Sequence, residues 1–285
     1  MKKLVLVVLL SFLIIALFGC SNKKKEYEFI VEDTIVTTGK FKMNAKLTIP
    51  VSKKSVPAVV MVHGSGPQDM DETINSLKPF KDLAEALAKK GIASLRYDKI
   101  TYTHINELVK EYDFTIYEEV VYDALSAVNL LKDNSKIDAN NIFILGHSLG
   151  AQFSPIILNE DSSINGAIML AGTPRHLLDV LIDQVKIQSE DVYKQIYPIY
   201  EYIRNLKEVV AGEEKQLYFG CYQKYWVHYN GINIESETIK ASEKHPLLIM
   251  QGGLDLQVAP STQDLYKTIL KDNPKVVYKY YDLLN

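Results

Sequence analysis

Buried strands and amphipathic helices alternate along the sequence from Pro57 to Gly172. Four runs are almost continuously apolar, namely PAVVMVHGSGP, IASLRYD, NIFILGHS and INGAIMLAG. Such runs are typical of strands that are covered on both faces. Segments with helical spacing separate them, among them residues 75–91 and 115–134. Because parallel neighbours need crossover helices, this order predicts an α/β fold with a mostly parallel, doubly wound sheet.

Further elements are expected before and after this central part. Residues 27–49 alternate apolar and polar side chains around the turn TTGK, which predicts an antiparallel hairpin. Residues 174–245 have helical patterns without a clear buried strand, and we expect them to form a helical lid. A strand, a helix and a final strand are predicted between His245 and Asn285. We therefore expect one domain over residues 27–285.

The amino-terminal twenty residues resemble a bacterial lipoprotein signal. MKK is basic, and the apolar stretch that follows is long enough for a signal peptide but short for a membrane span. Because Cys20 follows LFG, as in a lipobox, we expect residues 1–19 to be a signal peptide and Cys20 to be lipidated. Residues 20–26 would form a tether. An uncleaved anchor is the alternative, and both place the protein at the membrane, outside the cytoplasm.

The charge balance and the cysteine count limit the possible partners. The 285 residues carry a formal net charge of −3, without the basic stripe that would indicate nucleic-acid binding. If Cys20 is lipidated, Cys221 has no partner, and no intrachain disulfide is expected. The oligomeric state stays open.

The sequence GHSLG follows a predicted strand and precedes a predicted helix, and it matches the pattern G-x-S-x-G. In this context small flanking residues let the chain turn sharply, and the serine hydroxyl stands exposed at the carboxyl edge of the sheet. Ser148 is therefore a candidate nucleophile, and the N–H of Leu149 is a candidate donor to the oxyanion. The alternative is a Ser-Gly turn without catalytic meaning.

A second glycine-rich sequence, HGSGP, ends an earlier predicted strand. Such a loop can bring a second backbone N–H to the oxyanion, because glycines allow close approach. Ser65 is the expected donor, with Gly66 next. We expect His63 to order this loop by hydrogen bonding rather than to act as a base.

The sequences HGSGP, RYD, GHSLG and QGGLDLQV, in this order, resemble the α/β-hydrolase superfamily. The similarity is greatest to bacterial carboxylesterases with an HGSGP oxyanion loop and a helical lid, which are grouped with dienelactone hydrolases and serine aminopeptidases. It covers residues 27–285. The resemblance implies a Ser-Asp-His triad, no metal and no organic cofactor. It also implies that Asp255 is the triad acid. We expect Arg96 and Asp98 to be a structural or pocket-edge pair.

The expected catalytic histidine is missing from its usual place. In this fold the histidine follows the acid along the chain, whereas every histidine of this sequence precedes Asp255. We expect the carboxyl-terminal end to be truncated before the base, and hydrolysis of p-nitrophenyl acetate to stay barely above background. A histidine-led extension should restore turnover. His176 and His228, in the lid, are the plausible substitutes.

The lid segment is rich in aromatic side chains with polar tips. Eight tyrosines and the only tryptophan fall between residues 193 and 229. Tyr222, Tyr225 and Trp226 are expected to line a substrate pocket, although such side chains also pack lid helices together. No cluster of acids or arginines indicates a charged substrate. The predicted substrate is therefore a neutral ester with a short or medium acyl group.

These observations predict a membrane-anchored serine hydrolase of the carboxylesterase type that works through an acyl-enzyme. Two alternatives stay open. One is a lipid-anchored binding protein that keeps the pocket without the chemistry. The other is a serine peptidase, because the same triad cleaves amides.

Overall fold

The computed structural model describes residues 26–110 and 113–285. The predicted signal peptide, Cys20 and nearly all of the predicted tether lie outside the described residues. Within the two described ranges, no helix combines the length and the apolar character that a membrane span requires.

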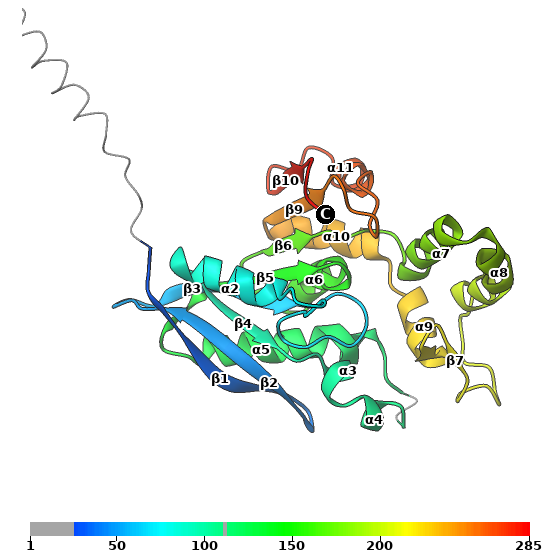
Figure 1. Ribbon diagram of the computed structural model, residues 1–285, viewed down its shortest axis with the longest axis horizontal. Coiled ribbons are helices and arrows are strands. Elements are labelled where there is room, and N and C mark those ends of the chain that lie inside the picture. Colours follow the sequence, from blue (N-terminus) through cyan, green and yellow to red (C-terminus); the bar gives the residue numbers. More distant parts are fainter. Residues whose placement is uncertain (1–25, 111–112) are drawn as a thin grey trace, which may run out of the picture.

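One eight-stranded sheet organises the molecule (Figure 1). Its strand order is β1-β2-β4-β3-β5-β6-β9-β10. The bounds are β1 (Phe29–Thr38), β2 (Phe41–Pro50), β3 (Val56–Val62), β4 (Ala93–Tyr97), β5 (Ile137–His147), β6 (Ala167–Leu170), β9 (Leu247–Gly252) and β10 (Val276–Tyr281). The pairs β1/β2 and β2/β4 are antiparallel, and all later pairs are parallel. The predicted hairpin and mostly parallel sheet are confirmed.

Helices cover both faces of the sheet. On one face, α2 packs Phe80 and Ala84 against Val59 and Met61 of β3. The larger core lies on the other face and includes the apolar sides of α5 and α6. The helices are α2 (Pro79–Lys89), α3 (Ile100–Thr103), α4 (Ile105–Leu108), α5 (Tyr122–Lys132), α6 (Leu149–Glu160), α7 (Leu177–Gln188), α8 (Glu190–Arg204), α9 (Gln223–Asn230), α10 (Ile234–Lys244) and α11 (Thr262–Leu270).

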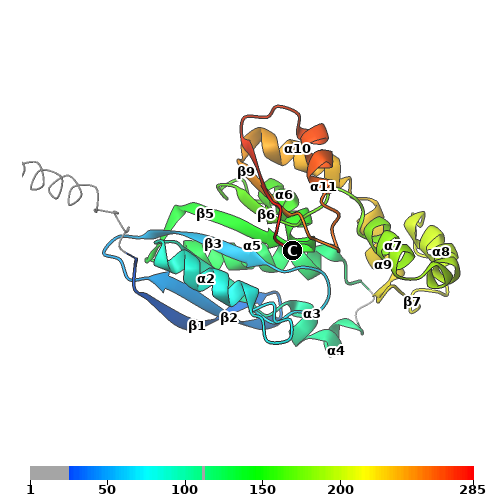
Figure 2. The ribbon, with the colours of Figure 1, turned by 45° about the horizontal axis from the view of Figure 1, so that its top comes forward.

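The segment predicted as a lid divides into two parts. The helices α7, α8 and α9 lie together beside one end of the sheet in both views (Figures 1 and 2). By contrast, α10 packs against α6 in the layer that covers the sheet. Of the segment predicted as the lid, the part that stands away from the sheet therefore ends at α9 (Figures 1 and 2).

A short hairpin in this lid was not predicted. It joins β7 (Leu217–Tyr218) to β8 (Cys221–Tyr222). Both turn residues have positive φ, 49° at Phe219 and 82° at Gly220. Such a turn suits a two-residue hairpin, but phenylalanine is not a usual turn signal, and strands of two residues leave no alternating pattern.

The helix predicted over residues 115–134 begins with a π-helical turn, η1 (Tyr117–Val121), that runs into α5. The amide of Tyr122 donates to the carbonyl of Tyr117, five residues earlier. Such π-turns are frequent at functional sites. This one carries Glu119, which is buried.

Candidate active site

Ser148 lies on the sharp turn that joins β5 to α6. Its backbone has φ 50° and ψ −111°, a conformation that is strained for a residue with a Cβ. The Ser148 amide donates to the carbonyl of Leu170 on β6 at 2.9 Å, which fixes the turn to the sheet. The residue is half-buried, so its side chain stays accessible.

The two glycines of the motif are required by close backbone contacts. A Cβ on Gly146 would lie 2.4 Å from the backbone of Gly150. A Cβ on Gly150 would lie 2.2 Å from the carbonyl oxygen of Val62 at the end of β3. Because neither neighbour is a flexible side chain, the turn can pack at the carboxyl edge of the sheet only with glycine at both positions.

The HGSGP loop lies directly against this turn. A Cβ on Gly64 would lie 3.4 Å from the Cβ of Ser148. Ser65, Ser148 and Leu149 line one cavity of about 250 Å³. In the described part of the chain, the amides of Ser65 and Leu149 donate to no protein acceptor. The structure thus brings the predicted nucleophile and the two predicted oxyanion donors to the same cavity.

Asp255 follows β9 in a loop at the same edge of the sheet. Its Oδ1 accepts the amides of Gln257 at 2.8 Å and Val258 at 2.9 Å. Its Oδ2 accepts Nε2 of Gln251 at 3.2 Å. Within the described ranges, no histidine hydrogen-bonds to this carboxylate, so its predicted role as the triad acid stays a prediction.

A carboxylate that the sequence did not single out joins the nucleophile turn to the oxyanion loop. Oε1 of Glu72 accepts the Gly64 amide at 2.7 Å and lies 2.9 Å from Nδ1 of His147. Burial would raise the pKa of Glu72, but the hydrogen bond and charge of His147 and the bond from Gly64 lower it. Burial would lower the pKa of His147, but Glu72, helped by the charge of Asp255, raises it. A lowered pKa of Glu72 and a raised pKa of His147 both favour the charged forms, and therefore an ion pair between the two side chains.

The histidines outside the turn are engaged in local structure. His63 is buried, its Nε2 lies 3.1 Å from the carbonyl oxygen of Asp69, and burial lowers its pKa to about 4. Its contact orders the loop, as expected. His176 caps α7 by accepting the amide of Leu178, and burial lowers its pKa to about 4 as well. Desolvation also lowers the pKa of His228. Within the described residues, neither lid histidine hydrogen-bonds to Ser148 or Asp255.

Arg96 and Asp98 both have structural contacts, as expected, but they do not bond to each other. Nε of Arg96 binds Oδ1 of Asp71 at 2.8 Å. Oδ1 of Asp98 accepts the amide of Met70 at 2.8 Å. Both side chains project from the end of β4 toward the segment that follows HGSGP, so each fixes that loop instead.

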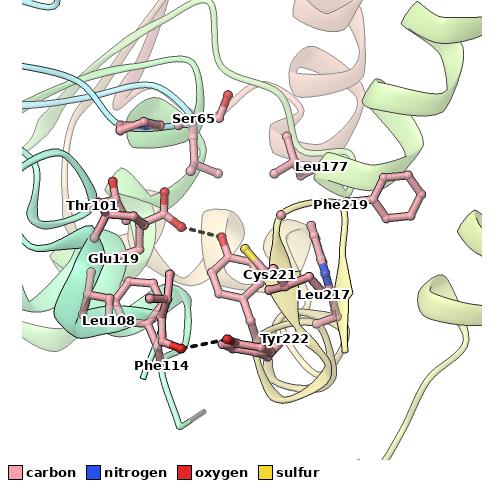
Figure 3. Close-up of a pocket in the computed structure, with 18 of the residues that line it drawn as sticks. Ser65, Thr101, Leu108, Phe114, Glu119, Leu177, Leu217, Phe219, Cys221 and Tyr222 are labelled. Atoms are coloured by element: carbon pink, nitrogen blue, oxygen red, sulfur yellow. Dashed lines mark hydrogen bonds between the residues drawn. The ribbon is translucent and has the colours of Figure 1, made fainter. Parts of the chain in front are cut away.

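A second, mainly apolar cavity of about 270 Å³ adjoins the first and shares Ser65, Leu149, Leu177 and Leu181 with it. The three predicted pocket residues line this cavity, and Tyr222 is labelled among them in Figure 3. Tyr225 and Trp226 are buried. Trp226 packs edge to face on Phe219 and donates Nε1 to the carbonyl of Tyr218, so it also holds the β7–β8 hairpin to α9. The hydroxyl of Tyr222 donates to the carbonyl of Val109 at 2.7 Å.

A buried ion pair reaches the wall of this apolar cavity through Glu119. Nζ of Lys99 binds Oε1 of Glu119 at 2.6 Å. The hydroxyl of Tyr225 donates to Oε2 of Glu119 at 2.7 Å, the bond drawn from Glu119 in Figure 3. Neither charge was predicted, because a lone lysine or glutamate has no spacing that indicates a site. Over residues 26–110 and 113–285, no group of histidine, cysteine and acidic side chains is arranged to hold a metal ion.

Known proteins that are similar to this chain include several hydrolases. No family model matches this chain. The chain is 35% identical over 278 residues to esterase EstD of Thermotoga maritima, in a match that covers 94% of this chain and 65% of that protein. The chain thus spans somewhat less than two thirds of its curated relative.

Solved structures of hydrolases share the fold at low identity. A Pyrococcus furiosus esterase matches with a TM-score of 0.56 and 20% identity, over 90% of this chain and 82% of that one. A Pyrococcus horikoshii acylaminoacyl peptidase matches with 0.59 and 17%, over 92% and 38%. A dienelactone hydrolase of Anabaena variabilis matches with 0.53 and 15%, over 90% and 86%. The solved structures show that the chain has the α/β-hydrolase fold, and its sequence is similar to that of an esterase.

Proposed function

We propose that the chain is a serine hydrolase that cleaves neutral carboxylic esters through an acyl-enzyme. One observation carries this proposal. Ser148 stands on a strained turn in the same cavity as two backbone amides without protein acceptors. A strained nucleophile turn that faces such donors is the arrangement needed for attack on an acyl carbon. The similarity to an esterase over 94% of this chain supports the choice of esters.

In the proposed reaction, Oγ of Ser148 attacks the carbonyl carbon, and the carbonyl π electrons move onto its oxygen. The amides of Ser65 and Leu149 stabilise that oxyanion, and the amino-terminal end of α6 adds its positive dipole. Collapse of the tetrahedral intermediate breaks the bond to the alcohol, which leaves with the proton that the Ser148 hydroxyl gave up. Water then attacks the acyl-enzyme by the same route and releases the carboxylic acid.

Proton transfer limits this reaction in the chain as given. Within the described residues, no histidine hydrogen-bonds to Asp255, and Nδ1 of His147 lies against Glu72. Without a base, the Ser148 hydroxyl keeps its proton and is a poor nucleophile. We propose that an imidazole held by Asp255 is the missing base, so that added imidazole or a histidine-led extension after Asn285 should raise the rate.

The apolar cavity is the proposed site of the acyl group. Its walls carry side chains without net charge apart from Glu119, whose carboxylate is already bound by Lys99 and Tyr225. Desolvating a charged acyl group there would be costly, which favours a neutral chain. The alternatives remain a serine peptidase and a binding protein. We also propose that lipidation of Cys20 anchors the protein at the outer side of the cell membrane, which intact-mass analysis of the native protein would test.

Labelling with a fluorophosphonate tests the proposed nucleophile. We expect slow modification of Ser148 in the 285-residue chain, faster modification in the chain extended by a histidine, and none in Ser148→Ala. Ester and peptide substrates would then be compared on the extended chain. If neither form were labelled, the binding-protein alternative would hold. If peptides were cleaved in preference to esters, the peptidase alternative would hold.

A further inference from the structure

Lys99 is a buried cation directly behind the oxyanion loop. Only 2% of its surface is exposed. Its Nζ donates to the carbonyl oxygen of Gly64 at 2.8 Å and to Glu119 at 2.6 Å. The proposed reaction does not use this lysine, yet a buried charge is costly unless it is paired and hydrogen-bonded.

The contact to Gly64 acts on the neighbouring donor. The carbonyl of Gly64 and the N–H of Ser65 belong to one planar trans peptide group, in which they point in opposite directions. When Lys99 holds the carbonyl oxygen, it also fixes the direction of the Ser65 N–H. A charged donor on the carbonyl also polarises the peptide group, which makes the N–H a stronger donor to an oxyanion.

The peptide group between His63 and Gly64 is held by an anion. The Gly64 N–H donates to the buried carboxylate of Glu72 at 2.7 Å. Gly64 is therefore fixed at its amide by an anion and at its carbonyl by a cation. Two such bonds remove the freedom that a glycine otherwise brings to a loop, so they keep Ser65 in place before a substrate arrives.

The lysine is connected to the lid through its carboxylate partner. Glu119 lies on the π-helical turn η1, and its second oxygen accepts the hydroxyl of Tyr225 on α9. Glu119 and Tyr225 both line the apolar cavity (Figure 3). A continuous set of hydrogen bonds thus runs from the lid, along the wall of this cavity, to the peptide group of Ser65.

We propose that Lys99 is a positioning residue that orients and polarises the Ser65 amide for the oxyanion, and that Glu119 and Tyr225 hold it there. This inference rests on the proposed serine hydrolase function. It predicts an effect on the rate of the chemical step rather than on substrate binding, because the oxyanion forms only in the transition state.

The test compares variants of the same chain by fluorophosphonate modification of Ser148. Lys99→Met alone would leave Glu119 buried and unpaired, so the main variant is Lys99→Met/Glu119→Gln, which removes both charges. The matched control is Lys132→Met/Asp161→Asn, another lysine–carboxylate pair at 2.6 Å. Asp161 lies at the far end of α6 from Ser148, about 18 Å away for a twelve-residue helix.

Loss of an entire oxyanion donor lowers rates about 10²–10³-fold. We expect the maximal modification rate of the main variant to fall about tenfold or more, but by less than the loss of an entire donor would cause. The fluorophosphonate concentration that gives half of the maximal rate should not change. The control should keep the parent rate. In ¹H–¹⁵N spectra of the unreacted protein, the Ser65 amide proton should move upfield only in the main variant.

Three outcomes are decisive. A folded main variant with the parent rate and an unmoved Ser65 signal would overturn the inference while leaving the proposed function intact. A change confined to the half-saturating concentration would assign the pair to substrate binding and overturn it too. Absence of Ser148 labelling in both the parent and the chain extended by a histidine would overturn the proposed function, and with it this inference.

Discussion

The strain at Ser148 gives a prediction about stability that does not depend on catalysis. With φ 50° and ψ −111°, the residue occupies a region that a side chain with a Cβ rarely adopts. Such a conformation costs on the order of 1–3 kcal/mol. Glycine would relieve this strain but carries an entropic cost of about 0.5–1 kcal/mol relative to alanine.

The matched variants are therefore Ser148→Gly and Ser148→Ala, which both remove the hydroxyl and differ only in the Cβ. We expect the glycine variant to be the more stable by about 1 kcal/mol, the net of these two effects. At the size of this chain, that corresponds to a melting temperature about 2–4 °C higher. Urea titration and thermal melting would measure the difference. A glycine variant that is less stable than the alanine variant would refute the strain at this turn.

Three further predictions follow from contacts in the site. Gly150→Ala should destabilise the fold by about 1–3 kcal/mol, because its Cβ would meet the Val62 carbonyl at 2.2 Å. The control Gly231→Ala, whose Cβ would meet nothing closer than 3.4 Å, should leave the stability unchanged. Equal unfolding midpoints for the two variants would contradict this prediction. Glu72→Gln should lower the pKa of His147, since burial is then opposed only by the charge of Asp255. The parent should lose the stability contributed by His147 as the pH rises from about 6.5 through its raised pKa, and the variant should lose less. An unchanged histidine NMR titration would refute the pairing. In the chain extended by a histidine, Cys221→Phe should fill the apolar cavity and lower kcat/KM for p-nitrophenyl octanoate about tenfold or more relative to the acetate ester. Equal losses for both esters would place the acyl group elsewhere.

The sheet and the nucleophile turn could be predicted because their signals are local in the sequence. The continuous apolar runs indicated buried strands, and the glycines around Ser148 are needed for contacts within the strand–turn–helix unit and with β3. The HGSGP loop was found for the same reason. It directly follows β3, and parallel strands bring their carboxyl ends to one edge.

The residues that support the site could not be predicted. Glu72 is 75 residues from His147, and Glu119 is 106 residues from Tyr225. Such pairs form only after the tertiary fold brings loops together, and single charged residues leave no periodic trace. The partners of Arg96 and Asp98 were missed for a similar reason. They stand two residues apart at the end of β4 and were expected to act as a pair, whereas each binds the loop that folds over this end of the strand.

The central claim is that Ser148 faces the amides of Ser65 and Leu149 across one cavity. A crystal structure of the fluorophosphonate adduct tests this most directly. The account predicts phosphorus bonded to Oγ of Ser148, with the phosphoryl oxygen about 2.7–3.1 Å from both amide nitrogens. An adduct on another residue, or a phosphoryl oxygen that points away from these two amides, would contradict it.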